Sequence, residues 1–497
     1  MIIDAFTTAL ASFTDLSFLL WMMAGTIVGL VFGIIPGIGS MTALALFLPF
    51  TFVLPPEQAL PFMMATMSMS NNGGTITAIL VGVPGVPGNA ATMLDGFQMT
   101  RRGEGGRALG AALTSSAAGG VLSVIMALGM VVLVLPMIMA ITNADMVFII
   151  LVGLAFIATL SRGSLNKGLI SAGLGLLISL VGYQSVSGLY RFTFGAIYLF
   201  DGVPMIPVAL GLFGLPVMID LATKGGTIAE AGAVTTRISD VWRGAKDVFH
   251  HRWLWLRSTV IGYIIGVLPG IGGEAAIWIC YAQAKQSSKY PEKFGTGVVE
   301  GVIAPESAGN GREGGGALTT FALGIPGTAV MALILAGLMM AGLRPGPSML
   351  TEHLSLSFSL LLVIAVANVI GTLMALPAAS YMAKVAYIPG RILAPLVLAI
   401  LVVGTFAYQQ RLTDLFTLLA FGGLGWALVK LRYNTAALFI GFVLGSLFEY
   451  YLFMSLKVAG PLFFIRPISL VLIVVFIAIL FYGPISRVVK RRFNMRS

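Results

Sequence analysis

Charged residues are scarce in this chain. They make up only 10% of its 497 residues, whereas hydrophobic residues make up 58% and the mean hydropathy is +0.98. A soluble protein of this length needs far more charge to cover its surface. The low charge therefore excludes an ordinary soluble domain and indicates a protein that lies within a lipid bilayer.

Cysteine and histidine are nearly missing as well. The single cysteine, Cys280, excludes a disulfide bond within the chain and argues against a thiol-ligated metal site. His250, His251 and His353 have no metal-binding spacing and lie beside no Gly-x-Ser-x-Gly element. A Walker A motif is absent, so this chain is not its own ATP motor. We therefore expect no enzyme and no cofactor, with Na⁺ left as a candidate coupling ion.

Long apolar runs, in contrast, recur through the whole chain. Because about 20 apolar residues cross a hydrocarbon core of roughly 30 Å, each run is a candidate membrane helix. We expect an all-α polytopic membrane protein with about ten to twelve transmembrane or half-spanning helices. The clearest runs are residues 122–141, 146–160, 354–376, 392–406 and 468–482.

Basic residues give the chain a net charge of +10, and they cluster between the apolar runs. The positive-inside rule explains such clusters without a nucleic-acid partner and places them, with the C-terminus, in the cytoplasm. The clustered residues are Arg101, Arg102, Arg107, Arg162, Lys167, Arg487, Lys490, Arg491, Arg492 and Arg496.

An internal duplication is the most informative feature of the sequence. Residues 26–40 read TIVGLVFGIIPGIGS, and residues 259–273 read TVIGYIIGVLPGIGG. In the same order, GGTITAILVGVPG at residues 73–85 matches GGALTTFALGIPG at residues 315–327. We infer two related halves, residues 1–222 and 258–497, joined by a basic cytoplasmic linker at residues 223–257. No Lys or Arg precedes Arg101, so no basic residue holds the start of the first half in the cytoplasm, whereas the second half begins directly after the basic linker. The two halves are therefore expected to have opposite topology, as inverted repeats do.

The four Pro-Gly motifs predict broken helices. Proline removes a backbone donor and glycine admits unusual conformations, and freed backbone groups are tolerated in a membrane only beside protein or a water-filled cavity. Such breaks mark the binding sites of many transporters, although single Pro and Gly residues also serve packing. The predicted substrate-binding residues are Ser70, Asn71, Asn72, Gly73, Gly74, Thr75, Pro84, Gly85, Asn89, Ser307, Asn310, Gly315, Gly316, Thr319, Pro326 and Gly327.

A second set beside the outer motifs is predicted to bind a coupling ion: Pro36, Gly37, Gly39, Ser40, Pro269, Gly270, Gly272, Gly273 and Glu274. Glu274 is either a proton or cation site, as intramembrane carboxylates often are, or a solvated residue at the interface. Arg312 either contacts an anionic substrate or pairs with Glu313 or Glu306. The sequence leaves these alternatives open.

The motifs resemble those of the TctA family, the large membrane subunit of the tripartite tricarboxylate transporters. The resemblance rests on GIIPGIGS, on GGTITAILVGVPG followed by LDGFQMTRRGEGGRAL, on GVLPGIGG, and on residues 294–347, which begin FGTGVVEGVIAPESAGNGREGGG. It extends from about residue 26 to residue 347, and the later apolar runs fit the family's length without specific motifs.

The resemblance implies a secondary importer of small di- or tricarboxylates in a bacterial inner membrane, driven by a Na⁺ or H⁺ gradient. It also implies two partners, a small TctB-like four-helix membrane subunit and a periplasmic TctC-like solute-binding protein. The chain departs from the family pattern at Asn72–Thr75, at Gly82 and at Ala308–Glu313, which lie at the proposed site. Two alternatives remain, a non-transporting scaffold or sensor subunit and, more remotely, an intramembrane enzyme.

Overall fold

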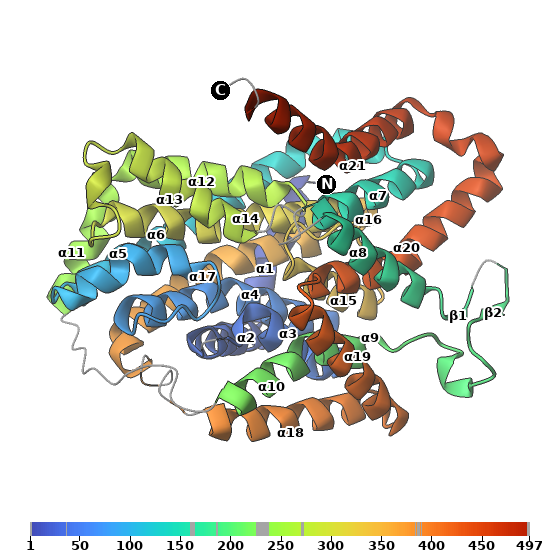
Figure 1. The fold of residues 1–497 in the computed structure, drawn as a ribbon, viewed down its shortest axis with the longest axis horizontal. Helices are drawn as coiled ribbons and strands as arrows, with labels where there is room; N and C mark the ends of the chain where they lie inside the picture. Colours follow the sequence, from blue (N-terminus) through green and yellow to red (C-terminus); the bar gives the residue numbers. More distant parts are fainter. Residues whose placement is uncertain are drawn as a thin grey trace.

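The computed structural model of the protein describes residues 2–35, 37–159, 165–184, 187–224, 238–269, 273–382, 384, 388 and 390–494. Helices dominate these residues (Figure 1). Up to the basic linker the elements are α1 (Ile2–Ala11), α2 (Leu16–Ile34), α3 (Gly39–Val53), α4 (Pro56–Leu80), α5 (Asn89–Arg101), α6 (Gly105–Met139), α7 (Asn143–Thr159), α8 (Leu165–Ser179), the antiparallel strands β1 (Gly182–Tyr183) and β2 (Tyr190–Arg191), α9 (Met205–Ala209) and α10 (Leu215–Lys224).

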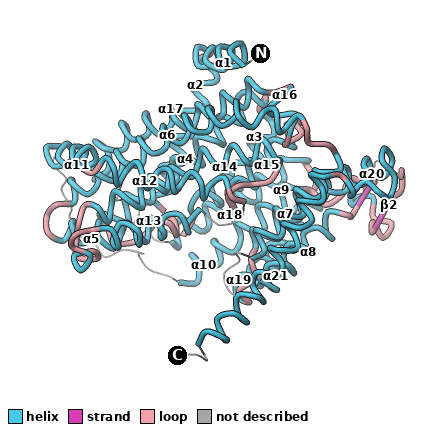
Figure 2. The backbone as a smooth tube through the Cα atoms, turned by 90° about the horizontal axis from the view of Figure 1, so that it is seen from above, coloured by secondary structure: helices cyan, strands magenta, loops and turns pink. Residues whose placement is uncertain are grey.

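The rest of the chain continues the bundle. Its helices are α11 (Ile238–His250), α12 (Arg252–Val267), α13 (Gly273–Ser287), α14 (Glu300–Leu323), α15 (Met331–Met340), α16 (Pro347–Thr351), α17 (Leu354–Met382), α18 (Gly390–Gln409), α19 (Thr413–Lys430), α20 (Thr435–Ala459) and α21 (Pro467–Asn494). Helix α1 lies at one face of the bundle and the end of α21 at the opposite face (Figure 2).

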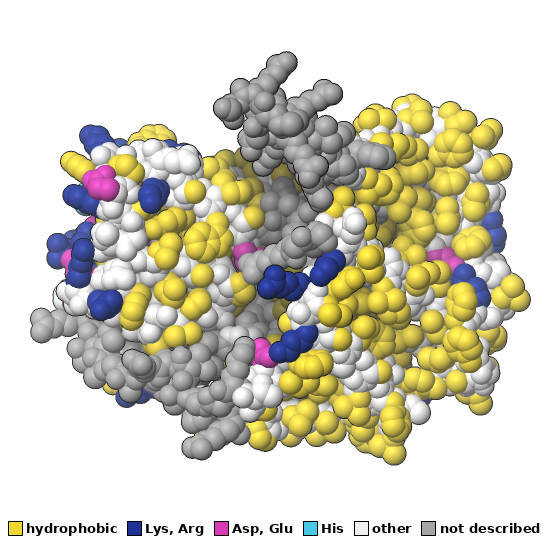
Figure 3. Space-filling view, viewed as in Figure 1, with side chains coloured by type: hydrophobic (Ala, Val, Ile, Leu, Met, Phe, Trp, Pro, Cys, Tyr) yellow, Lys and Arg dark blue, Asp and Glu magenta, His cyan; other side chains and the backbone are white. Residues whose placement is uncertain are grey.

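The helices have the length and composition of membrane helices. Within the described residues, five are long and apolar enough to cross a membrane, namely α2, α6, α17, most of α18, and α20 with the turn that follows it. Seven shorter apolar helices accompany them. Hydrophobic side chains cover much of the visible surface, where a soluble protein would be charged (Figure 3). The prediction of an all-α polytopic membrane protein is confirmed.

The predicted helix interruptions are present at the Pro-Gly motifs. Helix α2 ends before the first motif and α3 begins after it, and the pairs α4 and α5, α12 and α13, and α14 and α15 are separated in the same way. Gly37, Gly82 and Gly324 adopt positive φ angles of 87°, 73° and 65°, which few residues other than glycine tolerate. Pro36, Gly270 and Gly272 lie outside the described residues.

Residues that match in sequence make matching helix contacts. Helix α2 packs along α4, and α12 packs along α14. A Cβ atom at Gly29 would lie 2.5 Å from the carbonyl oxygen of Thr66, and one at Gly262 would lie 2.7 Å from that of Ala308. One turn further on, a Cβ atom at Gly33 would lie 2.1 Å from a carbonyl oxygen of α4, and one at Gly266 would lie 2.2 Å from a carbonyl oxygen of α14. Glycine at these positions lets each helix pair pack backbone to backbone.

Helices α4 and α14 lie side by side near the centre of the bundle and run antiparallel (Figures 1 and 2). Hydrogen bonds pair position 68 with 313, 71 with 310, and 75 with 306, so the residue number rises along one helix as it falls along the other. Helices α6 and α17 are antiparallel as well, because Thr372 reaches Leu113 while Asn368 lies beside Gly120. Helices α4 and α14, which match in sequence, thus meet with opposite directions.

Two acidic residues fix the connecting segments. The Arg107 guanidinium donates to Asp247 over 2.6 Å and docks α11, which belongs to the linker, on the start of α6. The linker's expected boundary at residue 257 falls inside α12. Asp95 of α5 accepts hydrogen bonds of 2.9, 2.8 and 3.0 Å from the backbone N–H groups of Gly295, Gly297 and Val298, ahead of α14.

Candidate substrate-binding cavity

A cavity of about 330 Å³ lies where the broken helices meet. Its walls include residues from each of the four interruptions, together with parts of α10, α14 and the α19–α20 connection. The lining residues that matter for its chemistry are Gly37, Gly39, Ser40, Asn71, Gly85, Val86, Glu274, Arg312, Glu313, Thr328 and Val330.

Four helices begin at this cavity. The lining includes the start of α3 at Gly39, the turn before α5 at Pro87, the first turn of α13 at Glu274 and the start of α15 at Met331. No side chain caps α3 or α5 among the described residues. The first N–H groups of a helix lack intrahelical partners and carry partial positive charge. Four such ends around one cavity favour an anion.

Arg312 adds a full positive charge. It is the one Lys or Arg that lines the cavity in the described part of the chain. Its guanidinium lies over Gly273, where a Cβ atom would be 2.1 Å from Nη1. That nitrogen is buried and has no hydrogen-bond partner among the described residues. A buried, unpaired guanidinium nitrogen is costly unless a ligand satisfies it, and a carboxylate matches its geometry.

Two carboxylates also line the cavity. Glu274 stands in the first turn of α13, where the helix dipole favours a negative charge. The Glu313 side chain accepts hydrogen bonds from Ser68 Oγ at 2.6 Å and Asn368 Nδ2 at 3.4 Å. Glu313 is only 7% exposed and forms no ion pair with any described residue, Arg312 included.

A cluster of asparagine amides lies next to Glu313. Asn71 Nδ2 donates to Asn310 Oδ1 at 3.0 Å, and Asn310 Nδ2 donates to Asn72 Oδ1 at 2.8 Å and to Asn368 Oδ1. Asn71 lines the cavity, whereas Asn72 and Asn310 are fully buried behind it. The structure therefore brings these three predicted residues together, but only Asn71 has access to a ligand in the cavity.

The other predicted substrate residues are divided between the cavity and the helix packing. Gly85 lines the cavity. Ser307 donates to Ile303 within its own helix, and Thr319 donates to Val267 at the end of α12. Ser70 Oγ is buried without a partner among the described residues. The remaining residues pack the helices or form the interruptions without lining the cavity: Gly73, Gly74, Thr75, Pro84, Asn89, Gly315, Gly316, Pro326 and Gly327.

The predicted ion-binding residues are divided in a similar way. Gly37, Gly39, Ser40 and Glu274 line the cavity. Gly273 lies beneath Arg312, and Pro269 does not line the cavity. Glu313 also lines the cavity, and a carboxylate within an otherwise apolar and small-residue helix is a signal for function.

A second carboxylate of α14, Glu306, is enclosed by hydroxyl groups. Thr92 and Ser116 donate to it over 2.6 and 2.7 Å, and Thr75 lies 2.9 Å from both of its oxygens. Glu306 is 1% exposed and lines none of the cavities described here. Its hydrogen bonds join α4, α5 and α6 to α14, so this carboxylate holds the bundle together.

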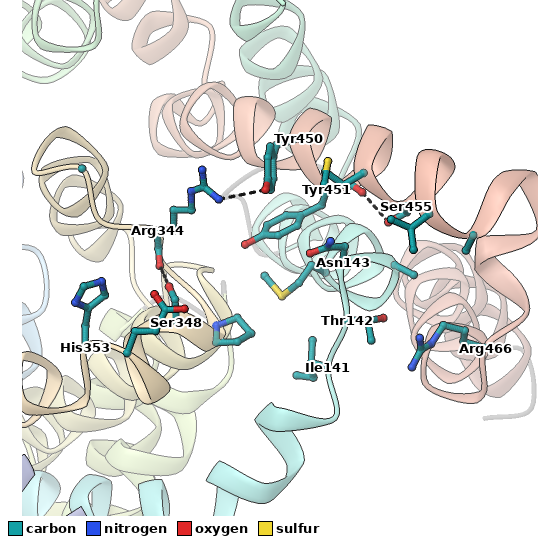
Figure 4. A pocket seen from close by; sticks show the side chains of 18 residues that line it. Ile141, Thr142, Asn143, Arg344, Ser348, His353, Tyr450, Tyr451, Ser455 and Arg466 are labelled. Carbon is teal, nitrogen blue, oxygen red and sulfur yellow. Dashed lines mark hydrogen bonds between the residues drawn. The ribbon is translucent and has the colours of Figure 1, made fainter. Parts of the chain in front are cut away.

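A larger cavity of about 710 Å³ lies elsewhere in the bundle, between α7, α16, α20 and the start of α21 (Figure 4). Arg344 points toward Tyr450 and donates to its hydroxyl at 3.1 Å, and Arg466 lies across the cavity. None of the predicted site residues lines it, and no helix interruption ends there. The smaller cavity is therefore the candidate site.

Broken membrane helices that begin around a polar cavity define a polytopic membrane protein with the architecture of solute transporters. The family comparison gives the same class. Residues 19–440 match the family model described as the tripartite tricarboxylate transporter TctA family, and the chain belongs to that family. The family resemblance inferred from the sequence is confirmed.

Two relatives from Agrobacterium vitis are similar to the chain. A 52.8 kDa protein in the TAR-I ttuC' 3' region is 32% identical over 435 residues, which are 87% of this chain and 86% of the relative. A protein in the TAR-II ttuC' 3' region is 34% identical over 191 residues, which are 38% of this chain and 79% of the relative. No solved structure matches the chain.

Proposed function

We propose that this chain is the large membrane subunit of a binding-protein-dependent secondary transporter that imports small di- or tricarboxylates. The observation that carries the proposal is the convergence of four helix N-termini and the unpaired Arg312 nitrogen on one cavity. The helix N-termini favour a negative charge, Arg312 Nη1 has no hydrogen-bond partner among the described residues, and a substrate carboxylate supplies an acceptor for both.

The dimensions and lining of the cavity support a small, polar substrate. Its volume of about 330 Å³ is at the lower end of the range for small-molecule sites. One carboxylate group of the substrate pairs with Arg312. A second is bound by N–H groups at the starts of α3 and α15, and Asn71 offers a neutral amide beside them. A Na⁺ or H⁺ gradient drives uptake.

The two halves act as inverted repeats, and alternating access arises from their movement about this cavity. The antiparallel crossing of α4 and α14 supports this arrangement, because it relates the matching helices by reversal. The term tripartite in the family's description supports the two partners, a TctB-like membrane subunit and a TctC-like binding protein. The protein is placed in a bacterial inner membrane, and its basic C-terminal segment in the cytoplasm.

Uptake of radiolabelled succinate, malate and citrate tests the proposal, in cells that express the chain with its two partner subunits. Replacing Arg312 by Gln removes a charge-assisted interaction of about 1.5–3 kcal/mol, so the half-saturating concentration should rise by about 10- to 150-fold. The matched control is Arg344→Gln, which alters an arginine that lines the larger cavity and should leave uptake close to that of the wild type.

The outcomes separate the candidate functions. Equal uptake by the wild type and Arg312→Gln would contradict the site. Carboxylate binding to the purified wild type without any uptake would favour the scaffold or sensor subunit instead.

A further inference from the structure

Glu313 has one side in the candidate cavity and the other in the hydrogen-bond network between the two halves. It lines the cavity with Arg312 and Asn71, and Ser68 of α4 and Asn368 of α17 bind its carboxylate from behind. A change in its charge therefore acts on a ligand in the cavity and on the α4–α14 contact at the same time.

Few other charged groups face Glu313. Arg312 stands next to it on α14, but its guanidinium is directed over Gly273 and makes no ion pair with Glu313. Across the cavity α13 contributes Glu274, and α12, which packs along α14, carries the buried Tyr263 hydroxyl. The facing parts of α4, α6, α15 and α17 contribute amides, hydroxyls and apolar groups. Among the described residues, Arg312 is therefore the one nearby cation, and it is not ion-paired with Glu313. A buried carboxylate that forms no ion pair is costly when ionised, and a proton removes that cost.

The charge on Glu313 also affects an anionic substrate directly. Ionised, it would repel a carboxylate bound in the same cavity, because charges a few ångströms apart interact strongly away from water. Protonated, it can donate a hydrogen bond to that carboxylate. Substrate and proton thus favour each other's binding, and this linkage is reciprocal.

The other two carboxylates are less suited to this role. Glu306 has no access to the cavity and is held by three hydroxyl groups. Glu274 also lines the cavity, but its side chain makes no hydrogen bond to a described residue of α4 or α17, so its charge does not act on the contact between the halves. Of these three carboxylates, Glu313 is the one that combines access to the cavity with hydrogen bonds to α4 and α17.

We propose that Glu313 is the proton-binding group of this transporter. Glu313 binds a proton when the substrate carboxylate binds, and both are released after the cavity opens to the other side of the membrane. The inference rests on the proposed carboxylate transport, and it identifies the proton as the coupling ion.

The test uses the complete three-subunit transporter in proteoliposomes, with radiolabelled succinate and citrate. In the wild type, the apparent affinity should fall as the pH rises above the Glu313 titration, by up to tenfold per pH unit, because one proton is taken up per substrate. A proton gradient should drive accumulation. Glu313→Gln, which imitates the protonated form, should bind with little pH dependence and exchange substrate, but it should not accumulate it. Glu313→Asp should restore part of the pH dependence.

The matched control is Glu300→Gln, on the same helix but outside the cavity, which should behave like the wild type. Proton-driven accumulation by Glu313→Gln, or accumulation driven by a Na⁺ gradient alone, would overturn the inference while leaving carboxylate transport intact. Loss of proton coupling in Glu274→Gln with coupling retained in Glu313→Gln would assign the role to Glu274. A wild-type transporter that neither binds nor exchanges any carboxylate would overturn the proposed function and this inference with it.

Discussion

Asn310 is predicted to stabilise the centre of the bundle rather than to bind substrate directly. Its amide makes three hydrogen bonds to other helices, with Asn71 and Asn72 of α4 and Asn368 of α17, and it is fully buried. Asn310→Ala removes all three bonds and leaves three buried polar atoms without that partner. Interhelical hydrogen bonds in membrane proteins contribute about 0.6 kcal/mol on average and at most about 1.7 kcal/mol. The free energy of unfolding should therefore fall by about 2–5 kcal/mol.

Ser307 provides the matched control, because it is equally buried and lies one turn away on the same helix. Its hydroxyl bonds only to the carbonyl oxygen of Ile303 in the preceding turn. That carbonyl can still accept from the helix backbone, so Ser307→Ala should cost less than about 1 kcal/mol.

Unfolding in mixed micelles with increasing SDS, followed by tryptophan fluorescence, measures both changes. In a double-mutant cycle with Asn368→Ala, the double variant should lose less stability than the sum of the two single losses, because the two amides are bonded to each other. If Asn310→Ala is no less stable than Ser307→Ala, the amide cluster does not hold the bundle and the reasoning is refuted.

Two further predictions concern close packing and a connecting segment. Gly33→Ala and Gly266→Ala place a methyl group 2.1 and 2.2 Å from a backbone carbonyl oxygen. Both substitutions should therefore reduce the monodisperse yield in size-exclusion chromatography. The control Gly129→Ala, whose methyl group would have no atom within 4 Å, should not reduce it. A normal yield for the first two would contradict the packing. Asp95→Ala removes the acceptor for three backbone N–H groups, so hydrogen exchange at residues 295–298 should accelerate. Exchange at β1 and β2 should stay unchanged. Unaltered exchange at residues 295–298 would show that other contacts hold this segment.

The sequence predicted the helix interruptions because proline and glycine have local physical effects that need no knowledge of the partner helices. The sequence does not determine which side of each broken helix faces the cavity. Of the neighbours Asn71 and Asn72, only Asn71 lines the cavity, and Asn72 is fully buried behind it. Which of them does so depends on the rotation of α4 against α14, which is set by tertiary packing.

The role of Arg312 could not be settled from sequence for a related reason. Glu313 and Glu306 were both reasonable partners by distance along the chain. In the structure each carboxylate is bound by hydroxyl or amide groups from other helices, and the guanidinium is left facing the cavity. The surroundings of Glu313 could not be predicted because its hydrogen-bond donors, Ser68 and Asn368, are remote in sequence.

The two copies of the duplication differ in charge at the positions that line the candidate cavity. Where the second copy has Arg312 and Glu313, the aligned positions of the first copy have Ser70 and Asn71. If the two copies exchange conformations during transport, Arg312 and Glu313 remain in the second copy. The inward-open and outward-open states therefore place these charges differently around the substrate. The half-saturating concentrations on the two sides of the membrane must then differ, while the final accumulation ratio is still set by the ion gradient alone.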